Sequence, residues 1–371
     1  MVNGPRHRRA PRQSGAERRR EVDEGMMQTV AKFDVDENLN AWRKAAATFE
    51  EEVAKAVVGQ DHVIRRLTVS VFARGHVLLE GDVGVGKTTL LRAVARAIGG
   101  AYERIEGTVD LMPSDLVYYT YLGEDGRPRV DRGPVLRFGE DLSVFFFNEI
   151  NRARPQVHSL LLRLMAERSI NAFNRDHRLP FLQVFADRNR VEKEETFELP
   201  AAARDRFFIE IAVETPSDRL IRQQLAFEPR FHDVDALVAT VQEGVFDHRQ
   251  LPTIATAIQR NVHTSQTLQN YVLDLWTAVQ KPAAAGISLP GIDMARLVRG
   301  GGSPRGLSYL VRGARVHAWL EGRDVVVPED IRALFLEIIA HRIFLDPIYE
   351  VRRENLARDL CAAIFAAVPS P

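Results

Sequence analysis

The sequence predicts a parallel α/β domain that is followed by an all-α domain. The first observation is a short apolar run, His76–Leu79, which precedes a glycine-rich loop and a helical pattern over Thr88–Ile98. The second is that apolar runs alternate with helical stretches as far as about residue 214. The third is that no convincing strand follows Pro216. Strands that alternate with helices are typical of a parallel sheet with helices on its faces.

The elements of the first half follow from hydrophobic spacing. Apolar residues recur every three or four positions over Asn38–Val57, which predicts an amphipathic helix that ends before Gly59. A second helix is predicted over Val63–Val71. Buried strands are expected at His76–Leu79, Val144–Phe147, Phe181–Ala186 and Phe207–Ile211. The α/β domain is therefore placed at residues 36–214.

The second half, residues 215–371, is predicted to be a helical domain. Its apolar residues follow helical spacing, and its connections hold the glycine and proline that end helices. The expected helices are Leu220–Phe227, Val234–Gln242, Ile254–Val262, Thr267–Gln280, Gly306–Glu321, Pro328–His341 and Glu350–Phe365.

Composition limits the class of protein. The chain has 371 residues, a length that favours two domains, and 45% of them are hydrophobic, which is enough for a sizeable core. The 50 basic and 50 acidic residues balance, which disfavours a protein built mainly to coat nucleic acid or an anionic membrane. The lone Cys361 excludes an internal disulfide and a cysteine-based metal cage. No apolar run reaches the ~18 residues of a membrane helix, so a cytoplasmic protein with no membrane span is expected.

The first residues differ from the rest in charge. The first 20 residues hold seven arginines and one acid, Glu17, and the remainder carries the balancing excess of acidic residues. Such a polar, basic stretch is expected to be disordered, and residues 1–35 are assigned to this tail. It is either a solvated tail or an arm that touches nucleic acid or an acidic partner.

A phosphate-binding loop is the clearest motif. Gly81–Thr88 fits the pattern G-x-x-x-x-G-K-[ST] and lies between a predicted strand and a predicted helix, the context this motif requires. Its backbone N–H groups and the helix N-terminus would hold phosphates, with Lys87 on the β- and γ-phosphates and the Thr88 hydroxyl on Mg²⁺. The motif predicts ATP and Mg²⁺ as cofactors. The residues expected to contact the nucleotide here are Gly81, Asp82, Val83, Gly84, Val85, Gly86, Lys87, Thr88 and Thr89.

A second strand ends in polar residues that suit hydrolysis. Ser143–Phe147 leads into Asn148 and Glu149, and Glu149 can polarise the attacking water as general base. The usual ending of such a strand is Asp-Glu. Asn148 keeps an acceptor for Thr88 or a metal-bound water but brings no charge, so weak hydrolysis and a raised Mg²⁺ requirement are expected. Aspartate at position 148 would then speed turnover, unless the neighbours of Asn148 have accommodated the amide.

Several motifs together resemble the MoxR-type AAA+ ATPases, and they run in order over most of the chain. They are Val58-Gly59-Gln60, Gly81–Thr88, Gly107–Asp115, Gly133-Pro134, Asn148–Arg152, Leu199–Phe207 and Gly302–Arg305. The resemblance implies an αβα nucleotide domain followed by a helical lid. It places ATP between the two, beside a neighbouring subunit in a ring.

The resemblance also implies roles for single residues. Asn189 resembles sensor 1, which helps to hold the attacking water and the γ-phosphate, although this chain has Ala186-Asp-Arg-Asn-Arg190 where the family usually shows Ala-Thr-Gln-Asn-Pro. Arg206 resembles the arginine finger that reaches the nucleotide of a neighbouring subunit, and Arg305 resembles sensor 2. Val58 and Gly59 are implied in nucleotide binding.

Two hairpins suit this group of proteins. The first would join strands Val117–Tyr121 and Pro128–Asp131, because Asp125-Gly126 is a strong hairpin signal. The second would join Ser169–Phe173 and Arg178–Phe181 through a four-residue turn. In a ring, such hairpins face the pore or a partner, or they are ordinary surface hairpins.

The resemblance implies a homo-hexamer that hydrolyses ATP and remodels or matures client proteins. The partner would be a client or a separate protein with a von Willebrand factor A domain. One alternative is a subunit that binds ATP and assembles but hydrolyses little, because of Asn148. Another is a nucleic-acid motor, which the acidic body of the chain disfavours and only the arginine-rich tail supports.

Overall fold

The computed structural model describes residues 38–189 and 197–371. Two compact units are distinguished, Met1–Trp42 and Arg43–Pro371. Of the first unit, only residues 38–42 are described, and they begin a helix over 38–56. The predicted disordered tail, residues 1–35, lies outside the described residues. The α/β half and the helical half both belong to the second unit, which is described below.

The centre of the second unit is a five-stranded parallel sheet with the strand order β2-β5-β8-β1-β9. Its strands are β1 (Val77–Gly81), β2 (Ala101–Glu106), β5 (Leu142–Asn148), β8 (Gln183–Asn189) and β9 (Ile209–Ala212). β5 is buried along its whole length, and Phe145 and Phe147 lie in the main core cluster. Since all five strands run in one direction, the polar residues that end β1, β5 and β8 gather at one edge of the sheet.

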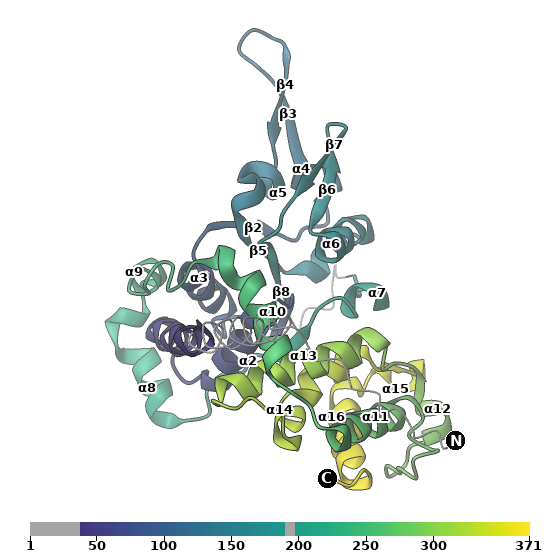
Figure 1. Ribbon diagram of the computed structural model, residues 1–371. Coiled ribbons are helices and arrows are strands. Elements are labelled where there is room, and N and C mark those ends of the chain that lie inside the picture. The colour runs from purple at the N-terminus through teal and green to yellow at the C-terminus, as the bar shows by residue number, and fades with distance from the viewer. Residues whose placement is uncertain (1–37, 190–196) are drawn as a thin grey trace, which may run out of the picture. The chain divides into compact units, whose positions relative to one another are not determined.

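Helices flank this sheet (Figure 1). Those of the α/β half are α2 (Asp61–Phe72), α3 (Lys87–Ile98), α4 (Pro113–Val117), α5 (Pro134–Arg137), α6 (Pro155–Glu167) and α7 (Ala201–Arg204). α3 begins directly after the glycine-rich loop and ends at Gly99, whose φ of 75° only glycine adopts without strain. The predicted αβα arrangement is therefore present.

Both predicted hairpins form, and they extend from the same side of the sheet (Figure 1). They are β3 (Tyr118–Leu122) with β4 (Pro128–Arg132), and β6 (Ser169–Ala172) with β7 (Arg175–Arg178). The predicted four-residue turn of the second hairpin is wrong. Phe173 and Asn174 both have positive φ angles, 52° and 56°, so a two-residue turn joins the strands. The Tyr118 and Phe173 rings lie 5.7 Å apart and connect the two hairpins.

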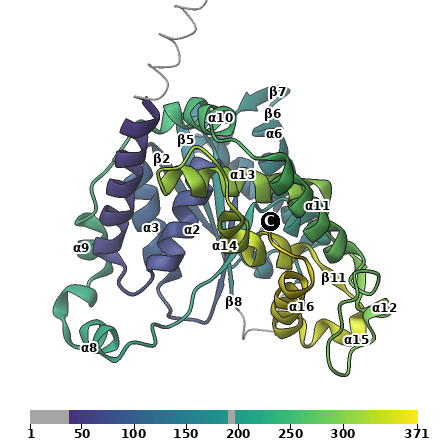
Figure 2. The same cartoon turned by 60° about the horizontal axis from the view of Figure 1, so that its bottom comes forward.

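The second half is helical, as predicted, apart from one short sheet. Figure 2 shows α13 and α14 side by side, and α13 also contacts α2 of the α/β half. The helices are α8 (Arg219–Phe227), α9 (Val234–Ala239), α10 (Leu251–Asn261), α11 (Gln266–Gln280), α12 (Met294–Leu297), α13 (Pro304–Leu320), α14 (Pro328–Ile339), α15 (Pro347–Glu350) and α16 (Arg353–Ala367). The expectation of no strand here is wrong, because β10 (Val298–Gly300) pairs with β11 (Phe344–Leu345). No helix in the described part of the chain is long and apolar enough to cross a membrane.

Two differences from the predicted strands have clear causes. β2 was not predicted, because its residues are polar or half-exposed at the edge of the sheet and give no apolar run. β8 covers Gln183–Asn189 instead of Phe181–Ala186, since polar residues continue the strand beyond its apolar part. Asn189 is therefore the last residue of a strand and lies opposite Gly81 of β1.

Candidate active site

The glycine-rich loop has the backbone that a phosphate cradle requires. Gly84 and Gly86 have φ angles of 82° and 90°, a region that disfavours other residues. At Gly81 a Cβ atom would lie 2.4 Å from the carbonyl oxygen of Val213, so no larger residue fits. The N-terminus of α3 has no side-chain cap among the described residues, which leaves its N–H groups available to an anion.

Lys87 lies at the centre of the site. Its buried ammonium donates hydrogen bonds to the carbonyl oxygens of Gly81 at 2.7 Å and of Asp82 at 3.1 Å. It also donates to Oδ1 of Asn189 at 2.5 Å. The structure thus brings the predicted phosphate-binding lysine and the predicted sensor residue into direct contact.

Glu149 is held on both carboxylate oxygens. Asn189 Nδ2 donates to Oε1 at 3.1 Å, and Arg152 Nη1 donates to Oε2 at 3.0 Å. Glu149 has a φ of 52°, an uncommon backbone conformation for this residue type that is often found at functional sites. Asn189 therefore bridges Lys87 and the candidate general base. The predicted group of Lys87, Glu149 and Asn189 forms as one cluster.

Asn148 makes a contact that sequence reasoning did not foresee. Its Nδ2 donates a hydrogen bond of 2.6 Å to Oε1 of Glu106, the last residue of β2. Because the amide nitrogen is used in this bond, the amide oxygen is the atom that can accept from a metal-bound water. This contact favours the interpretation that Asn148 is accommodated by its neighbours.

The donor set around the loop fits Mg²⁺ that arrives with a nucleotide. The Thr88 hydroxyl and the Asn148 amide oxygen are hard oxygen donors, which Mg²⁺ prefers. The described residues contain no group of three or more His, Cys, Asp or Glu side chains that could hold a metal by themselves. Two protein ligands, Thr88 and Asn148, suit Mg²⁺, because this ion usually takes one or two protein ligands together with substrate phosphates and waters.

Asp187 is a site residue that was missed. It is 2% exposed on β8, its Oδ1 accepts a hydrogen bond of 2.6 Å from the Glu149 N–H, and its Oδ2 lies 3.8 Å from Lys87 Nζ. Burial raises the pKa of Asp187 to about 6, against the lowering effect of the Glu149 N–H and Lys87. The available signal was its position two residues before Asn189. Alternate residues of a strand share a face, so any side chain there faces the site.

Val58 and Gly59 are connected to the loop through residues 213–216, which contact both. A Cβ atom at Gly59 would lie 3.1 Å from Pro216, and the side chain of the following residue, Gln60, donates to the carbonyl oxygen of Glu214 at 2.6 Å. This segment directly follows Val213, which touches Gly81. The predicted nucleotide-contacting residues at 58–59 and 81–89 are therefore brought to the same end of the sheet.

Arg206 and Arg305 lie together in a different place. Both line a pocket of about 170 Å³ whose other arginines are Arg74, Arg168 and Arg312. No acidic residue of the described chain lines this pocket. Burial, and then repulsion from Arg168 and Arg312, lowers the pKa of Arg74 to about 10. Such an excess of guanidinium groups suits an anion.

This pocket is at the far end of β1 from the phosphate-binding loop. Gly75 and His76 line the pocket and precede β1, whereas Gly81 ends that strand. At about 3.3 Å per residue the five residues of β1 separate the two places by roughly 15 Å. Neither Arg206 nor Arg305 therefore reaches a phosphate on the loop of its own chain. Arg305, the predicted sensor 2 residue, thus lies beside Arg206, the predicted arginine finger, instead of beside the loop.

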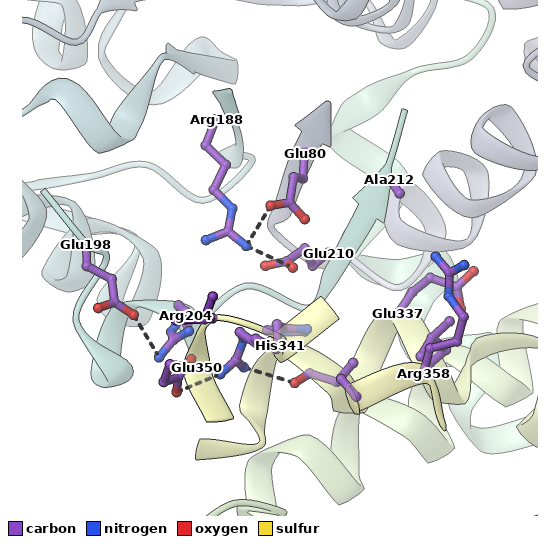
Figure 3. A pocket seen from close by; sticks show the side chains of 15 residues that line it. Glu80, Arg188, Glu198, Arg204, Glu210, Ala212, Glu337, His341, Glu350 and Arg358 are labelled. Carbon is purple, nitrogen blue, oxygen red and sulfur yellow. Dashed lines mark hydrogen bonds and ion pairs between the residues drawn. The ribbon is translucent and has the colours of Figure 1, made fainter. Parts of the chain in front are cut away.

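A third group of charges lies on the other face of the sheet. Figure 3 shows the Arg188 guanidinium between Glu80 and Glu210, with ion pairs of 3.2 and 3.1 Å, in a pocket of about 450 Å³. Glu80 directly precedes Gly81, and Arg188 directly precedes Asn189. Helices α14 and α16 contribute the facing wall, with Glu337 and Arg358 among its residues. The helical half thus shares a pocket with β1 and β8, the two strands that lead to the candidate phosphate site.

Comparisons with known proteins agree with this arrangement. Residues 76–209 match the ATPase family associated with various cellular activities (AAA), and residues 294–360 match an AAA lid domain. The chain is 67% identical to Protein MoxR of Methylorubrum extorquens over 91% of this chain and 98% of that protein. It is 34% identical to Chaperone MoxR1 of Mycobacterium tuberculosis over 79% of this chain and 74% of that protein. A crystal structure of a candidate ATPase from Cytophaga hutchinsonii superposes with a TM-score of 0.78 and 30% identity, over 92% of this chain and 99% of that one.

Proposed function

The chain belongs to the MoxR-type AAA+ ATPases, and from that premise we propose that it hydrolyses ATP in a ring of identical subunits to remodel or mature client proteins. The contact of Lys87 with Asn189, and of Asn189 with Glu149, is the observation that carries the proposal. These three side chains would serve as the phosphate-binding cation, the γ-phosphate sensor and the general base, and their cluster beside an uncapped helix N-terminus supports the proposal.

The residues of the cluster have separate tasks. Thr88 and Asn148 would hold Mg²⁺, which when bound neutralises charge that develops on the phosphate oxygens. Lys87 exchanges its carbonyl and amide partners for phosphate oxygens. Glu149, oriented by Arg152 and Asn189, accepts a proton from the attacking water. The amide of Asn189 accepts from Lys87 and donates to Glu149, so a change in the partners of Lys87 would alter the hydrogen bond that orients the base.

The position of the two arginines, Arg206 and Arg305, supports a ring. Arg206 and Arg305 share a pocket roughly 15 Å from the loop of their own chain, which is beyond the reach of either side chain. In a ring, the same pocket of a neighbouring subunit would supply both guanidinium groups to the γ-phosphate. AAA+ proteins typically form hexameric rings, and a homo-hexamer is part of this proposal.

The client role rests on the family. The name of the mycobacterial relative describes a chaperone, and the exposed tyrosines of β3 offer a surface for a client or for a separate protein with a von Willebrand factor A domain. The lone, buried Cys361 keeps the cytoplasm as the expected location. The subunit that binds ATP but scarcely hydrolyses it is the second candidate, because Asn148 brings no charge.

Lys87→Ala tests nucleotide binding. The variant should keep its fold and lose ATP binding, because the loop then has no cation for the β- and γ-phosphates. Binding of a fluorescent ATP analogue and a thermal melt measure the two properties. Released phosphate from the unmodified, Mg²⁺-saturated protein separates the active ATPase from the second candidate. Unchanged nucleotide affinity in a folded Lys87→Ala variant would contradict the proposal.

A further inference from the structure

The phosphate site holds its negative charge in an unexpected place. β5 ends in an amide, Asn148, where the charge beside Mg²⁺ would normally lie. The neighbouring strand β8 instead brings a buried carboxylate, Asp187, to the same edge of the sheet. We propose that Asp187 supplies the charge for the Mg²⁺ side of the site that Asn148 lacks. This inference rests on the proposed ATP site.

The first argument is the position of the Asp187 carboxylate. Phe147 of β5 pairs with Ala186 of β8. The next residues, Asn148 and Asp187, therefore lie at the same level on neighbouring strands. The Asp187 carboxylate lies near both the candidate base and the lysine. One oxygen is 2.6 Å from the backbone nitrogen of Glu149, and the other is 3.8 Å from Lys87 Nζ. A charge at this point therefore lies beside the lysine and the backbone of the candidate base, and it would also act on a metal ion held by Thr88 and Asn148.

The second argument is that a carboxylate at position 148 would be opposed. Asn148 Nδ2 donates to Glu106 at 2.6 Å, and an aspartate in its place would set two carboxylates against each other. The amide at 148 and the carboxylate at 187 thus form a consistent set. The negative charge of the site therefore lies on β8, at Asp187, instead of on β5 at position 148.

The third argument separates charge from backbone support. The Asp187 hydrogen bond to the Glu149 N–H helps to hold Glu149 at its positive φ. Asparagine at position 187 keeps an oxygen that can accept this bond but removes the charge. Asp187→Asn therefore tests the charge alone.

The experiment measures the Mg²⁺ concentration at which a non-hydrolysable, fluorescent ATP analogue reaches half-maximal binding. Asp187→Asn should raise this midpoint roughly tenfold, the size of one charge-assisted hydrogen bond. Moving the charge back with Glu106→Gln, Asn148→Asp and Asp187→Asn together should return the midpoint to within about threefold of the unmodified chain. Glu106→Gln alone is the matched control and should change it less than about threefold, because Glu106 is half-exposed and also pairs with Arg104.

The outcomes distinguish this inference from the proposed function. If the unmodified chain binds no analogue at any Mg²⁺ concentration, the ATP site itself is wrong. If it binds, but Asp187→Asn leaves the midpoint unchanged or the triple variant recovers nothing, Asp187 serves only as a backbone anchor and the inference fails. Asp187→Thr provides the same loss of charge should Asp187→Asn not fold.

Discussion

Arg305 donates a hydrogen bond to the carboxylate of Asp205, the residue that directly precedes Arg206. Arg305 of the helical half and the predicted arginine finger, Arg206, thus meet at the same short segment, although they are 99 positions apart in the sequence. The Ser303 hydroxyl donates to the same carboxylate at 2.6 Å, and the buried Arg342 lies 3.3 Å from it. Asp205 therefore links the start of α13 to the segment that carries Arg206.

This arrangement predicts that Arg206 and Arg305 act across a subunit interface as a pair. Each single alanine variant should keep ATP binding and lose assembly-dependent hydrolysis, since a trans arginine contributes roughly 10³–10⁵-fold in favourable systems. Mixing either variant with Glu149→Gln subunits should restore some activity, because some sites then pair an intact Glu149 with both arginines of a neighbour. The measurement is phosphate release from co-assembled mixtures.

A mixture of Arg206→Ala with Arg305→Ala decides between two placements of Arg305. If both arginines come from the same neighbour, every site in this mixture lacks one of them, and activity should not recover. If Arg305 instead served the nucleotide of its own chain, some sites would have both arginines, and recovery would contradict the placement seen here.

Asp205 is predicted to be a positioning residue for this pair. Asp205→Ala should leave ATP affinity unchanged but lower assembly-dependent hydrolysis at least tenfold, a change of about 1.4 kcal/mol in the transition state. It should also lower the free energy of unfolding by about 2–3 kcal/mol, because Arg342 is 1% exposed and loses its carboxylate. Ser303→Ala, which removes one neutral donor, is the control and should have a smaller effect on both. A normal rate in a folded Asp205→Ala protein would show that the arginines need no shared anchor.

Local patterns in the sequence were enough for four of the five strands of the parallel sheet, for the loop and for the polar residues that follow β5. Gly81–Thr88 and Glu149 were predicted from a phosphate-loop pattern and from a buried strand with a polar end. Asn189 came only from the resemblance to the MoxR-type family, and the structure places it in contact with Glu149. The partner of Arg305 could not be predicted, since the α/β sheet and the helical half pack through contacts between residues far apart in sequence. Asp187 was missed because an acid inside a strand gives no motif.

The charged pocket on the other face of the sheet leads to a prediction on stability. Arg188 balances Glu80 and Glu210, and these ion pairs keep the pKa of Arg188 above its ordinary value even though burial alone would lower it. Arg188→Gln should lower the free energy of unfolding by about 2–4 kcal/mol, because two partly buried carboxylates lose their partner. Urea denaturation measures this loss. Adding Glu80→Gln to Arg188→Gln should recover part of it, whereas additive losses would show that the two side chains are not coupled.

The last prediction concerns acid stability at the start of α14. The carboxylate of Asp330 is fully buried and accepts hydrogen bonds from Arg323 at 2.6 and 2.7 Å, from the Val327 N–H at 2.8 Å and, through a contact of 2.7 Å, from His317 Nδ1. Burial alone would raise the pKa of Asp330, but the hydrogen bonds from Arg323 and His317 outweigh it and hold that pKa below its ordinary value.

A carboxyl group whose pKa is lower in the folded state stabilises the fold above its unfolded pKa of about 3.9, and this contribution is lost as pH falls through the folded value. Asp330→Asn should therefore lower the free energy of unfolding by about 2–3 kcal/mol at neutral pH. The difference from the unmodified chain should shrink once the pH falls below about 4, because protonated Asp330 then resembles the amide. Urea denaturation across this pH range measures it, and the exposed neighbour Glu329→Gln, which changes only the charge near the helix N-terminus, should shift stability by at most about 1 kcal/mol. A difference between Asp330→Asn and the unmodified chain that stays constant down to acid pH would mean that the shape of the buried site, and not the charge of Asp330, stabilises this junction.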